Sequence, residues 1–132
     1  MVTEAGTLLV YGNGISAVFV LSRVREGGKT IVVLRLVGGN FASCSKRVVA
    51  GTSSATAPKK KVVRQLWGSG KGNFRTTGGY ASATVRGTIW LTADRCDGTQ
   101  VTVRRGIVLV RDLVRRSTVS VTAGHTYLAR KR

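Results

Sequence analysis

The 132-residue sequence is poor in the residues on which most enzymes and metal proteins depend. It has a single histidine, His125. Its five carboxylates are Glu4, Glu26, Asp94, Asp97 and Asp112. Acid–base pairs, nucleophilic triads and metal centres draw their groups from these residue types. So short a supply predicts that the chain is not an enzyme and that it holds no cofactor or metal.

The two cysteines, Cys44 and Cys96, are too few for a disulfide scaffold or a four-ligand zinc site. Either they form one disulfide, or they are two inert thiols. A bond between them would close a loop of about 52 residues and would stabilise the fold by about 4 kcal/mol. A nucleophilic pair of Cys96 with His125 is a weaker hypothesis, because no third group is in place to orient the histidine.

No apolar run is long enough to cross a bilayer as a helix, which needs about 20 consecutive apolar residues. The longest runs, at 15–21 and 31–37, are much shorter. Glu4 stands where a secretory signal peptide would carry basic residues, and no small-residue cleavage site follows. Two expectations remain: a cytoplasmic protein, or an exported one whose leader lies outside this sequence.

Positive charge is abundant, because 22 lysines and arginines stand against 5 acids and give a net charge of +17. Such a charge attracts nucleic acid, anionic membranes and acidic cell-surface polymers without choosing among them. Most of the excess lies after residue 43. The candidate polyanion-binding residues are Lys59, Lys60, Lys61, Arg64, Lys71, Arg75, Arg86, Arg104, Arg105, Arg111, Arg115 and Arg116.

Short runs with apolar residues at every second position are bounded by Gly, Asn-Gly or Asp-Gly pairs. This is the pattern of strands joined by tight turns. It predicts N-terminal strands at residues 7–11, 16–22 and 30–37 and a meander of about five strands after residue 82. The predicted fold is all-β: a single antiparallel β-sandwich or β-roll with short Gly or Asp turns and little or no helix.

The sequence divides into three parts within one domain that spans residues 1–132. Residues 1–43 hold the N-terminal strands, residues 44–61 form a basic exposed loop, and residues 62–132 hold the β-meander. The basic run that begins at Pro58 resembles a nuclear localisation signal but is more simply a solvated linker. Residues 62–67 are either one helical turn or a further strand.

The alternation of apolar residues also predicts a core. Its expected members are Ile89, Leu91, Val101, Val103, Ile107, Leu109, Val119 and Val121. The arginines between them are expected on turns and outer faces. Trp67, Phe74 and Tyr80 are more simply core side chains, although the alternative is that they stack on nucleic-acid bases. The segment 68–72 lacks the spacing of a phosphate-binding loop, so a flexible turn is predicted there.

The residues after 82 resemble the FecR-type domain. The matching features, in order, are the Val85-Arg86-Gly87-Thr88 turn, the Asp97-Gly98 hairpin, the V-x-V strand at 101–103, Gly106, the V-x-V strand at 108–110 and the V-x-V-x-A-G segment at 119–124. This resemblance covers residues 83–128. It implies a non-catalytic β module for protein or surface interaction, with no catalytic residue or cofactor.

A wider resemblance, from residue 30 to the C-terminus, is to actinobacterial extracytoplasmic proteins that carry this domain. It adds the Gly-Gly-Asn-Phe-x-x-Cys segment at 38–44, the basic loop and the segment at 62–80. The resemblance implies that Cys44 and Cys96 pair and that the protein works outside the cytoplasm. Better-known FecR proteins are membrane-anchored sigma-factor regulators, and this sequence shows neither their cytosolic segment nor their transmembrane helix.

Two functions are therefore expected. The first is that of a non-catalytic extracytoplasmic FecR-like module whose partner is an unidentified protein or an acidic surface polymer. The alternative is a basic β-barrel that binds single-stranded nucleic acid or other polyanions without sequence selectivity. Neither expectation defines an oligomeric state.

Overall fold

The computed structural model describes residues 1–3, 5–45 and 61–131. These residues are mostly in strands, which confirms the all-β prediction. The strands are β1 (Val2–Thr3), β2 (Gly6–Tyr11), β3 (Val18–Glu26), β4 (Lys29–Val37), β5 (Val62–Thr77), β6 (Ala81–Arg95), β7 (Gly98–Arg105), β8 (Ile107–Asp112), β9 (Ser117–Thr122) and β10 (Thr126–Arg130). One short 3-10 helix, η1 (Phe41–Ser45), follows β4 in the described residues.

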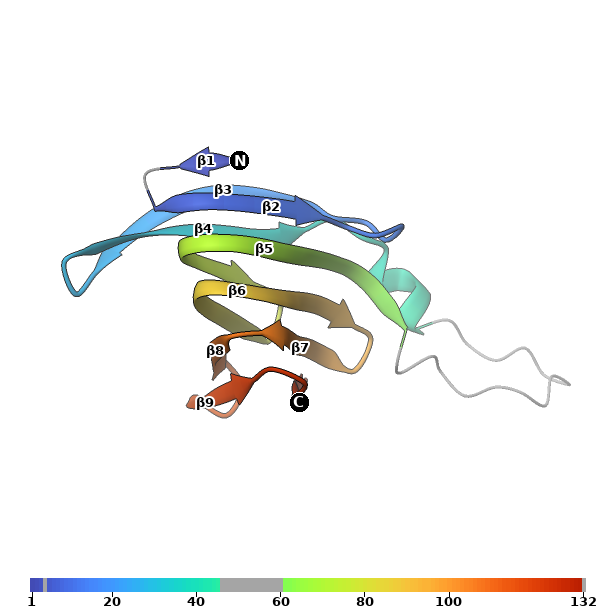
Figure 1. Ribbon diagram of the computed structural model, residues 1–132. Coiled ribbons are helices and arrows are strands. Elements are labelled where there is room, and N and C mark those ends of the chain that lie inside the picture. Colours follow the sequence, from blue (N-terminus) through green and yellow to red (C-terminus); the bar gives the residue numbers. More distant parts are fainter. Residues whose placement is uncertain (4, 46–60, 132) are drawn as a thin grey trace, which may run out of the picture.

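The strands form one sheet that folds over on itself into two layers, because β5 and β6 turn back across the molecule (Figure 1). The middle of β5, residues 67–72, pairs with β2, and its last part, residues 74–77, pairs with β4. Likewise, the first part of β6 pairs with β8 and its second part with β7. One layer therefore runs β1-β2-β5-β6-β7-β10, and the other runs β3-β4-β5-β6-β8-β9. Every pair is antiparallel except β4 with β5.

The core lies between the two layers and draws side chains from both. Trp90 of β6 is the largest fully buried side chain, and its indole Nε1 donates to Thr76 Oγ1 at 2.9 Å. A Cβ on Gly68 of the neighbouring β5 would lie 2.6 Å from the Trp90 ring. The strand therefore needs glycine at position 68, because any larger residue would displace the indole.

The core predicted from the sequence is partly wrong. The members found buried are Val101, Val103 and Val121, and those found half-buried are Ile89, Leu91 and Val119. Ile107 and Leu109 point outward and are 60% and 48% exposed, because Val108 and Val110 take the inner face of β8. Successive residues of a strand face opposite sides, so an error of one residue exchanges the two faces.

Two predicted turns are continuous strands. The segment 68–72 lies within β5, and the Val85-Arg86-Gly87-Thr88 segment lies within β6. The two strands stay paired across both segments, with a register shift between Lys71 and Phe74. The glycines here allow a bend that carries each strand from one layer to the other. Residues 62–67, left open between helix and strand, belong to β5.

The pairing after β6 also differs from a simple meander. β8 returns to β6 instead of pairing with β7, and β10 returns to β7. The chain thus changes layer between β7 and β8, where Gly106 has a φ of 84°. It changes layer again after β9, where Gly124 has a φ of 85°. β7 and β8, and likewise β9 and β10, therefore lie in opposite layers, and a glycine with positive φ lies between the two strands of each pair.

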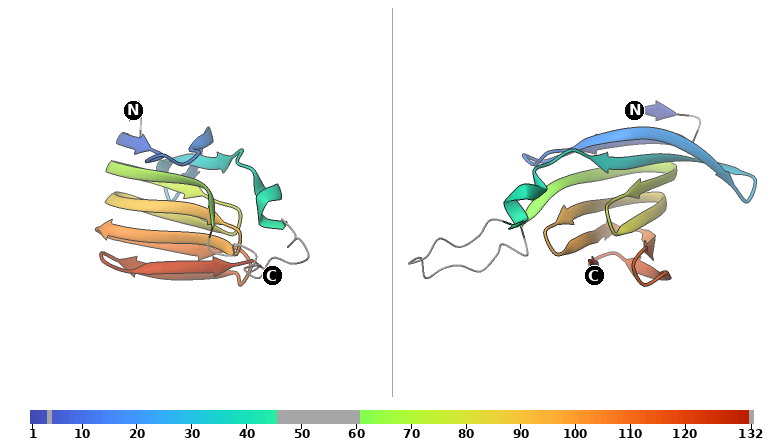
Figure 2. Two further views of the ribbon diagram at one scale, coloured as in Figure 1. Left: turned by 90° about the vertical axis from the view of Figure 1, so that its right-hand side faces the viewer. Right: turned by 180° about the vertical axis from the view of Figure 1, so that it is seen from behind.

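The N-terminal strands lie close to their predicted positions, as β2, β3 and β4, although β3 begins two residues later and ends four residues later than predicted. The turn of the β3–β4 hairpin extends beyond the other strands, both in Figure 1 and in the view from behind in Figure 2. β4 leads into η1, in which Cys44 is bonded to Cys96, and the two Cα atoms lie 5.3 Å apart. The disulfide implied by the resemblance is thus confirmed. Residues 46–60, which make up most of the predicted basic loop and include Lys59 and Lys60, lie outside the described residues.

Candidate functional site

Several of the candidate cations are neutralised inside the fold. Every carboxylate in the described part of the chain forms a salt bridge with an arginine. The pairs are Arg64 with Asp94, Arg75 with Glu26, Arg95 with Asp97, and Arg115 with Asp112. Arg64, Arg75 and Arg115 were predicted to bind a polyanion, but their guanidinium groups already hold a carboxylate.

Arg64 connects three parts of the fold. Its Nε donates to Asp94 Oδ2, its Nη1 donates to the Gly38 carbonyl at 3.0 Å, and its guanidinium lies 4.8 Å from the centre of the Phe41 ring. The side chain of Asp94 also accepts from Thr99 Oγ1 at 2.6 Å. Arg64 therefore ties the end of β4 and η1 to the β5–β6 pair.

Glu26 and Asp112 have pKa values below their ordinary range. Two hydrogen bonds from Arg75, and then its charge, lower the pKa of the exposed Glu26. Burial by itself would raise the pKa of Asp112. Hydrogen bonds from the Arg115 and Val114 amides, the Tyr127 hydroxyl and the Arg115 guanidinium outweigh this effect, so the pKa is lowered. The bond to Asp112 raises the pKa of Tyr127 in turn. Both arrangements fix local structure and leave these carboxylates ionised at neutral pH.

The three aromatic side chains considered for stacking on bases, Trp67, Phe74 and Tyr80, offer little open surface. Phe74 is 1% exposed and belongs to the core, whereas Trp67 is 7% exposed and is buried outside the core cluster. The guanidinium of Arg104 lies 4.4 Å from the centre of the Trp67 ring, which Tyr11 also stacks against at 6.1 Å. Tyr80 is half-buried. Arg104 thus packs on an aromatic pair on the outside of the β2–β5–β7 layer.

The remaining candidate cations are exposed and have no ion pair within the described residues. They are Lys61, Lys71, Arg86, Arg105, Arg111 and Arg116. Together with Arg104 and Arg115, the arginines predicted on turns and outer faces are all exposed, which confirms that expectation. Three of these cations, Lys71, Arg86 and Arg105, line adjacent hollows in the surface at the bend of β5 and β6.

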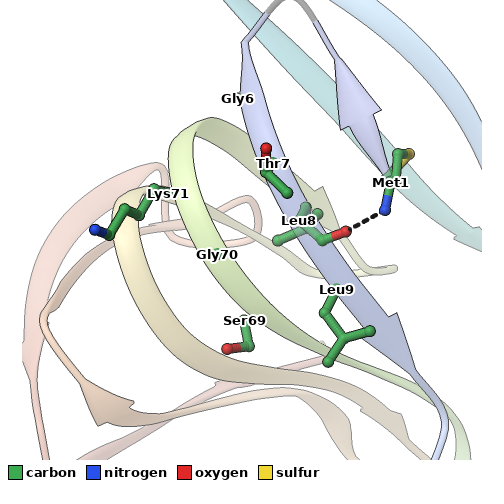
Figure 3. A pocket seen from close by; sticks show the side chains of 8 residues that line it. All are labelled: Met1, Gly6, Thr7, Leu8, Leu9, Ser69, Gly70 and Lys71. Carbon is green, nitrogen blue, oxygen red and sulfur yellow. Dashed lines mark hydrogen bonds between the residues drawn. The ribbon is translucent and has the colours of Figure 1, made fainter.

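Three adjacent hollows lie along this bend, and we call them together the trough. The first, of about 630 Å³, lies between the N-terminal segment with β2 on one side and β5 on the other (Figure 3). The second, of about 310 Å³, shares Ser69, Gly70 and Lys71 with the first. The third, of about 610 Å³, shares Gly87 and Thr88 with the second. Lys71 and Arg105 line the second hollow, and Arg86 lines the third.

The middle of the trough exists because β6 has a glycine there. A Cβ on Gly87 would meet only the Gly70 carbonyl oxygen, at 3.9 Å, so the space beside it is open. The neighbouring Thr88 is 4% exposed, and its hydroxyl has no hydrogen-bond partner in the part of the chain that the structure describes. The trough therefore combines open space, three exposed cations and one unsatisfied buried hydroxyl, a set that suits an extended anionic ligand.

The hypothesis of a nucleophilic pair is wrong. Cys96 is in the disulfide, and His125 Nδ1 is hydrogen-bonded to Thr122 Oγ1 at 3.0 Å. Within the described ranges, no three His, Cys, Asp or Glu side chains come together as a metal site would require. No helix in the described part of the chain has the length and apolar character needed to cross a membrane.

The three cations of the trough are among the candidate residues predicted from the sequence, but the sequence does not predict that they lie at one site. One local signal could have done so, because each stands next to a glycine: Gly70-Lys71, Arg86-Gly87 and Arg105-Gly106. Comparisons of the chain with protein-family models, with curated proteins and with solved structures find no significant match. The geometry of the trough is accordingly the main ground for a functional proposal.

Proposed function

We propose that this protein is a non-catalytic, extracytoplasmic FecR-like module that binds an acidic ligand, on a protein or on a cell surface, in the trough. The observation that carries the proposal is the gathering of Lys71, Arg86 and Arg105 around Gly87. Four arginines, Arg64, Arg75, Arg95 and Arg115, are neutralised by carboxylates, whereas these three cations present their charge to the open side of a hollow.

Support for a location outside the cytoplasm comes from the Cys44–Cys96 disulfide, because such bonds form and persist in oxidising compartments. The FecR-like sequence pattern adds to it. Its V-x-V segments at 101–103, 108–110 and 119–121 lie in β7, β8 and β9, in the order that the resemblance implies. The carboxylates held by arginines favour a binding role over catalysis, since general acid–base chemistry needs groups that are free to exchange a proton.

The alternative, single-stranded nucleic acid, is less well supported. Non-specific binding of single strands combines a basic groove with aromatic faces on which bases stack. The trough has the cations but no aromatic residue among those that line it. Phe74 is in the core and Trp67 is already covered by Tyr11 and Arg104. Charge alone would attract a nucleic acid, but with no more selectivity than for other polyanions.

The test is a pair of triple variants with the same change in charge. The first replaces the cations of the trough, Lys71→Gln, Arg86→Gln and Arg105→Gln. The control replaces three other exposed arginines, Arg35→Gln, Arg111→Gln and Arg116→Gln. Binding to heparin, as a probe of acidic surface polymers, and to a single-stranded oligonucleotide is measured at several salt concentrations.

We expect the trough variant to lose about tenfold more heparin affinity than the control at the same salt concentration. Oligonucleotide binding is expected to be weaker than heparin binding and to produce no change in tryptophan fluorescence. Equal losses in both triple variants would show that binding reports the overall charge of the protein, and the proposal would then be wrong. Tighter binding of the oligonucleotide, with quenching of tryptophan fluorescence, would favour the nucleic-acid alternative.

A further inference from the structure

We infer that the third hollow of the trough holds a segment of a partner protein in which carboxylate and aliphatic side chains alternate. This inference rests on the proposed function and adds the class of partner to it. We call this hollow of about 610 Å³ the β8 groove. Its lining residues include Lys29, Ile31, Arg86, Thr88, Ile107 and Leu109.

The aliphatic part of the ligand is indicated by β8, which is apolar on both faces. Val108 and Val110 are fully buried in the core, while Ile107 and Leu109, on the opposite face, are 60% and 48% exposed. Strands that are apolar on both faces are typical of sheets that are covered on both sides. No element in the described part of the chain covers the outer side of β8. An aliphatic surface from a partner would complete this packing.

The acidic part of the ligand is indicated by the charge around the groove. Lys29 and Arg86 are exposed at its edges, and neither forms an ion pair within the described residues. Glu26, which is the register partner of Lys29 in the β3–β4 hairpin, is held by Arg75, which also donates to Thr84 of the groove wall at 2.9 Å. The groove is therefore positive at its edges and apolar at its base, and its complement is a ligand with carboxylates beside aliphatic groups.

The hydroxyl of Thr88 favours a peptide over a lipid. This hydroxyl is buried and has no hydrogen-bond partner among the described residues. An unsatisfied buried hydroxyl destabilises a fold unless a ligand supplies the missing hydrogen bond. The backbone of an extended peptide carries donors and acceptors along its whole length, whereas the acyl chain of a lipid has none. A protein segment can therefore satisfy Thr88 while its side chains contact Ile107 and Leu109.

The experiment compares two fluorescent peptides of equal length and equal charge. In one, aspartate alternates with leucine, and in the other, aspartate alternates with serine. Vesicles that contain an anionic phospholipid form a third arm. We expect the wild-type protein to bind the leucine peptide at least about tenfold more tightly than the serine peptide, because only the leucine side chains bury apolar surface in the groove.

Two variants and one control locate the binding. Ile107→Ser with Leu109→Ser is expected to abolish the preference for the leucine peptide, since both side chains are exposed and their loss leaves the core intact. Leu113→Ser, at a similarly exposed leucine that does not line the groove, is expected to keep it. Thr88→Val is expected to weaken binding of the leucine peptide by about fivefold without any loss of stability, because a methyl group replaces a hydroxyl that is unsatisfied in the free protein.

Equal affinity of the two peptides for the wild-type protein would overturn the inference, and so would an unchanged preference in the Ile107 and Leu109 variant. Tighter binding of the vesicles than of the leucine peptide would overturn it in favour of a lipid. None of these outcomes alters the heparin comparison of the two triple charge variants. The failure of this inference is thus distinguishable from the failure of the proposed function.

Discussion

Arg64 of β5 and Asp94 of β6 form a salt bridge in which Nε lies 2.6 Å from Oδ2. Asp94 is 1% exposed, and it also accepts hydrogen bonds from the Gly79 amide and the Thr99 hydroxyl. A carboxylate so far from water is stable only while it is surrounded by donors. The pair therefore holds β5 to β6 at the edge of the core nearest the disulfide.

Replacement of Arg64 by methionine should destabilise the protein by about 3 kcal/mol, because the charge of Asp94 would remain buried without its partner. Arg75→Met is the matched control, since its partner Glu26 is 54% exposed and can be solvated. Its expected cost is much smaller, because an exposed ion pair contributes little to stability. Urea unfolding gives both values. Equal losses in the two variants would contradict the role assigned to the Asp94 site.

Loss of the disulfide should lower the free energy of unfolding by about 4 kcal/mol. The bond joins residues that are 52 positions apart, so it removes much freedom from the unfolded chain. Cys44→Ser with Cys96→Ser removes it without leaving a reactive thiol, and a reductant should destabilise the wild-type protein but not this variant. The measured mass of non-reduced protein, made under oxidising conditions, should be lower than that of the reduced protein by the mass of two hydrogens. Two free thiols in this material would contradict the assigned bond.

Replacement by alanine should destabilise the protein at Gly68 of β5 but not at Gly87 of the neighbouring β6. At Gly68 a methyl group would press on the Trp90 ring, which is fully buried and hydrogen-bonded to Thr76. We expect a loss of about 2 kcal/mol in thermal or urea unfolding. At Gly87 the methyl group finds open space, so the stability should change by less than about 0.5 kcal/mol.

Gly87→Ala is expected to weaken the binding of heparin all the same, because it partly fills the hollow between Lys71 and Arg105. This variant thus separates binding from folding. A stable Gly87→Ala protein with unchanged heparin affinity would mean that the ligand does not enter the second hollow.

Stability should depend on pH through Asp112. Its pKa is lowered in the folded protein, so its contribution is present above the ordinary pKa of a free aspartate and is lost as the pH falls through the lowered value. Tyr127→Phe removes one of the hydrogen bonds that lower this pKa. The variant should be less stable than wild type at pH 7, and the difference should shrink at pH values below about 4.

Urea unfolding from pH 7 down to pH 3 measures this convergence. A difference that stays constant over the whole range would show that Tyr127 acts through packing alone. The range avoids the alkaline titration of Tyr127 itself, whose pKa is raised by the same hydrogen bond.

The positions of the strands could be predicted because alternation is a local property of the sequence. β2 and β4 lie close to their predicted residues, β7 contains the predicted strand at 101–103, and a Gly27-Gly28 turn separates β3 from β4. The outward face of β8 could not be predicted, because Ile107 and Leu109 are as apolar as Val108 and Val110 and alternation alone does not choose between them. The bends in β5 and β6 resemble turns in the sequence, since both strands carry glycines where they change layer.

The cations of the site were predicted individually, but their grouping was not. Whether a guanidinium is neutralised depends on carboxylates far away in the sequence, as with Arg75 of β5 and Glu26 of β3, two strands that both pair with β4. Lys71 and Arg105 line the same hollow because their strands, β5 and β7, pair with the two edges of β6. Such relationships follow from strand pairing, which the sequence pattern does not determine.

The passage of β5 and β6 through both layers has a consequence for how the molecule opens. The two layers cannot separate from each other while each stays intact, because β5 and β6 belong to both layers and their pairing would have to break. Amide hydrogens of β5 and β6 should therefore exchange with solvent only when the whole protein unfolds. The edge strands β1 and β3, each paired on one side only, should exchange earlier. The two layers should therefore unfold as one cooperative unit. The trough should be as rigid as β5 and β6, because residues of these two strands line it.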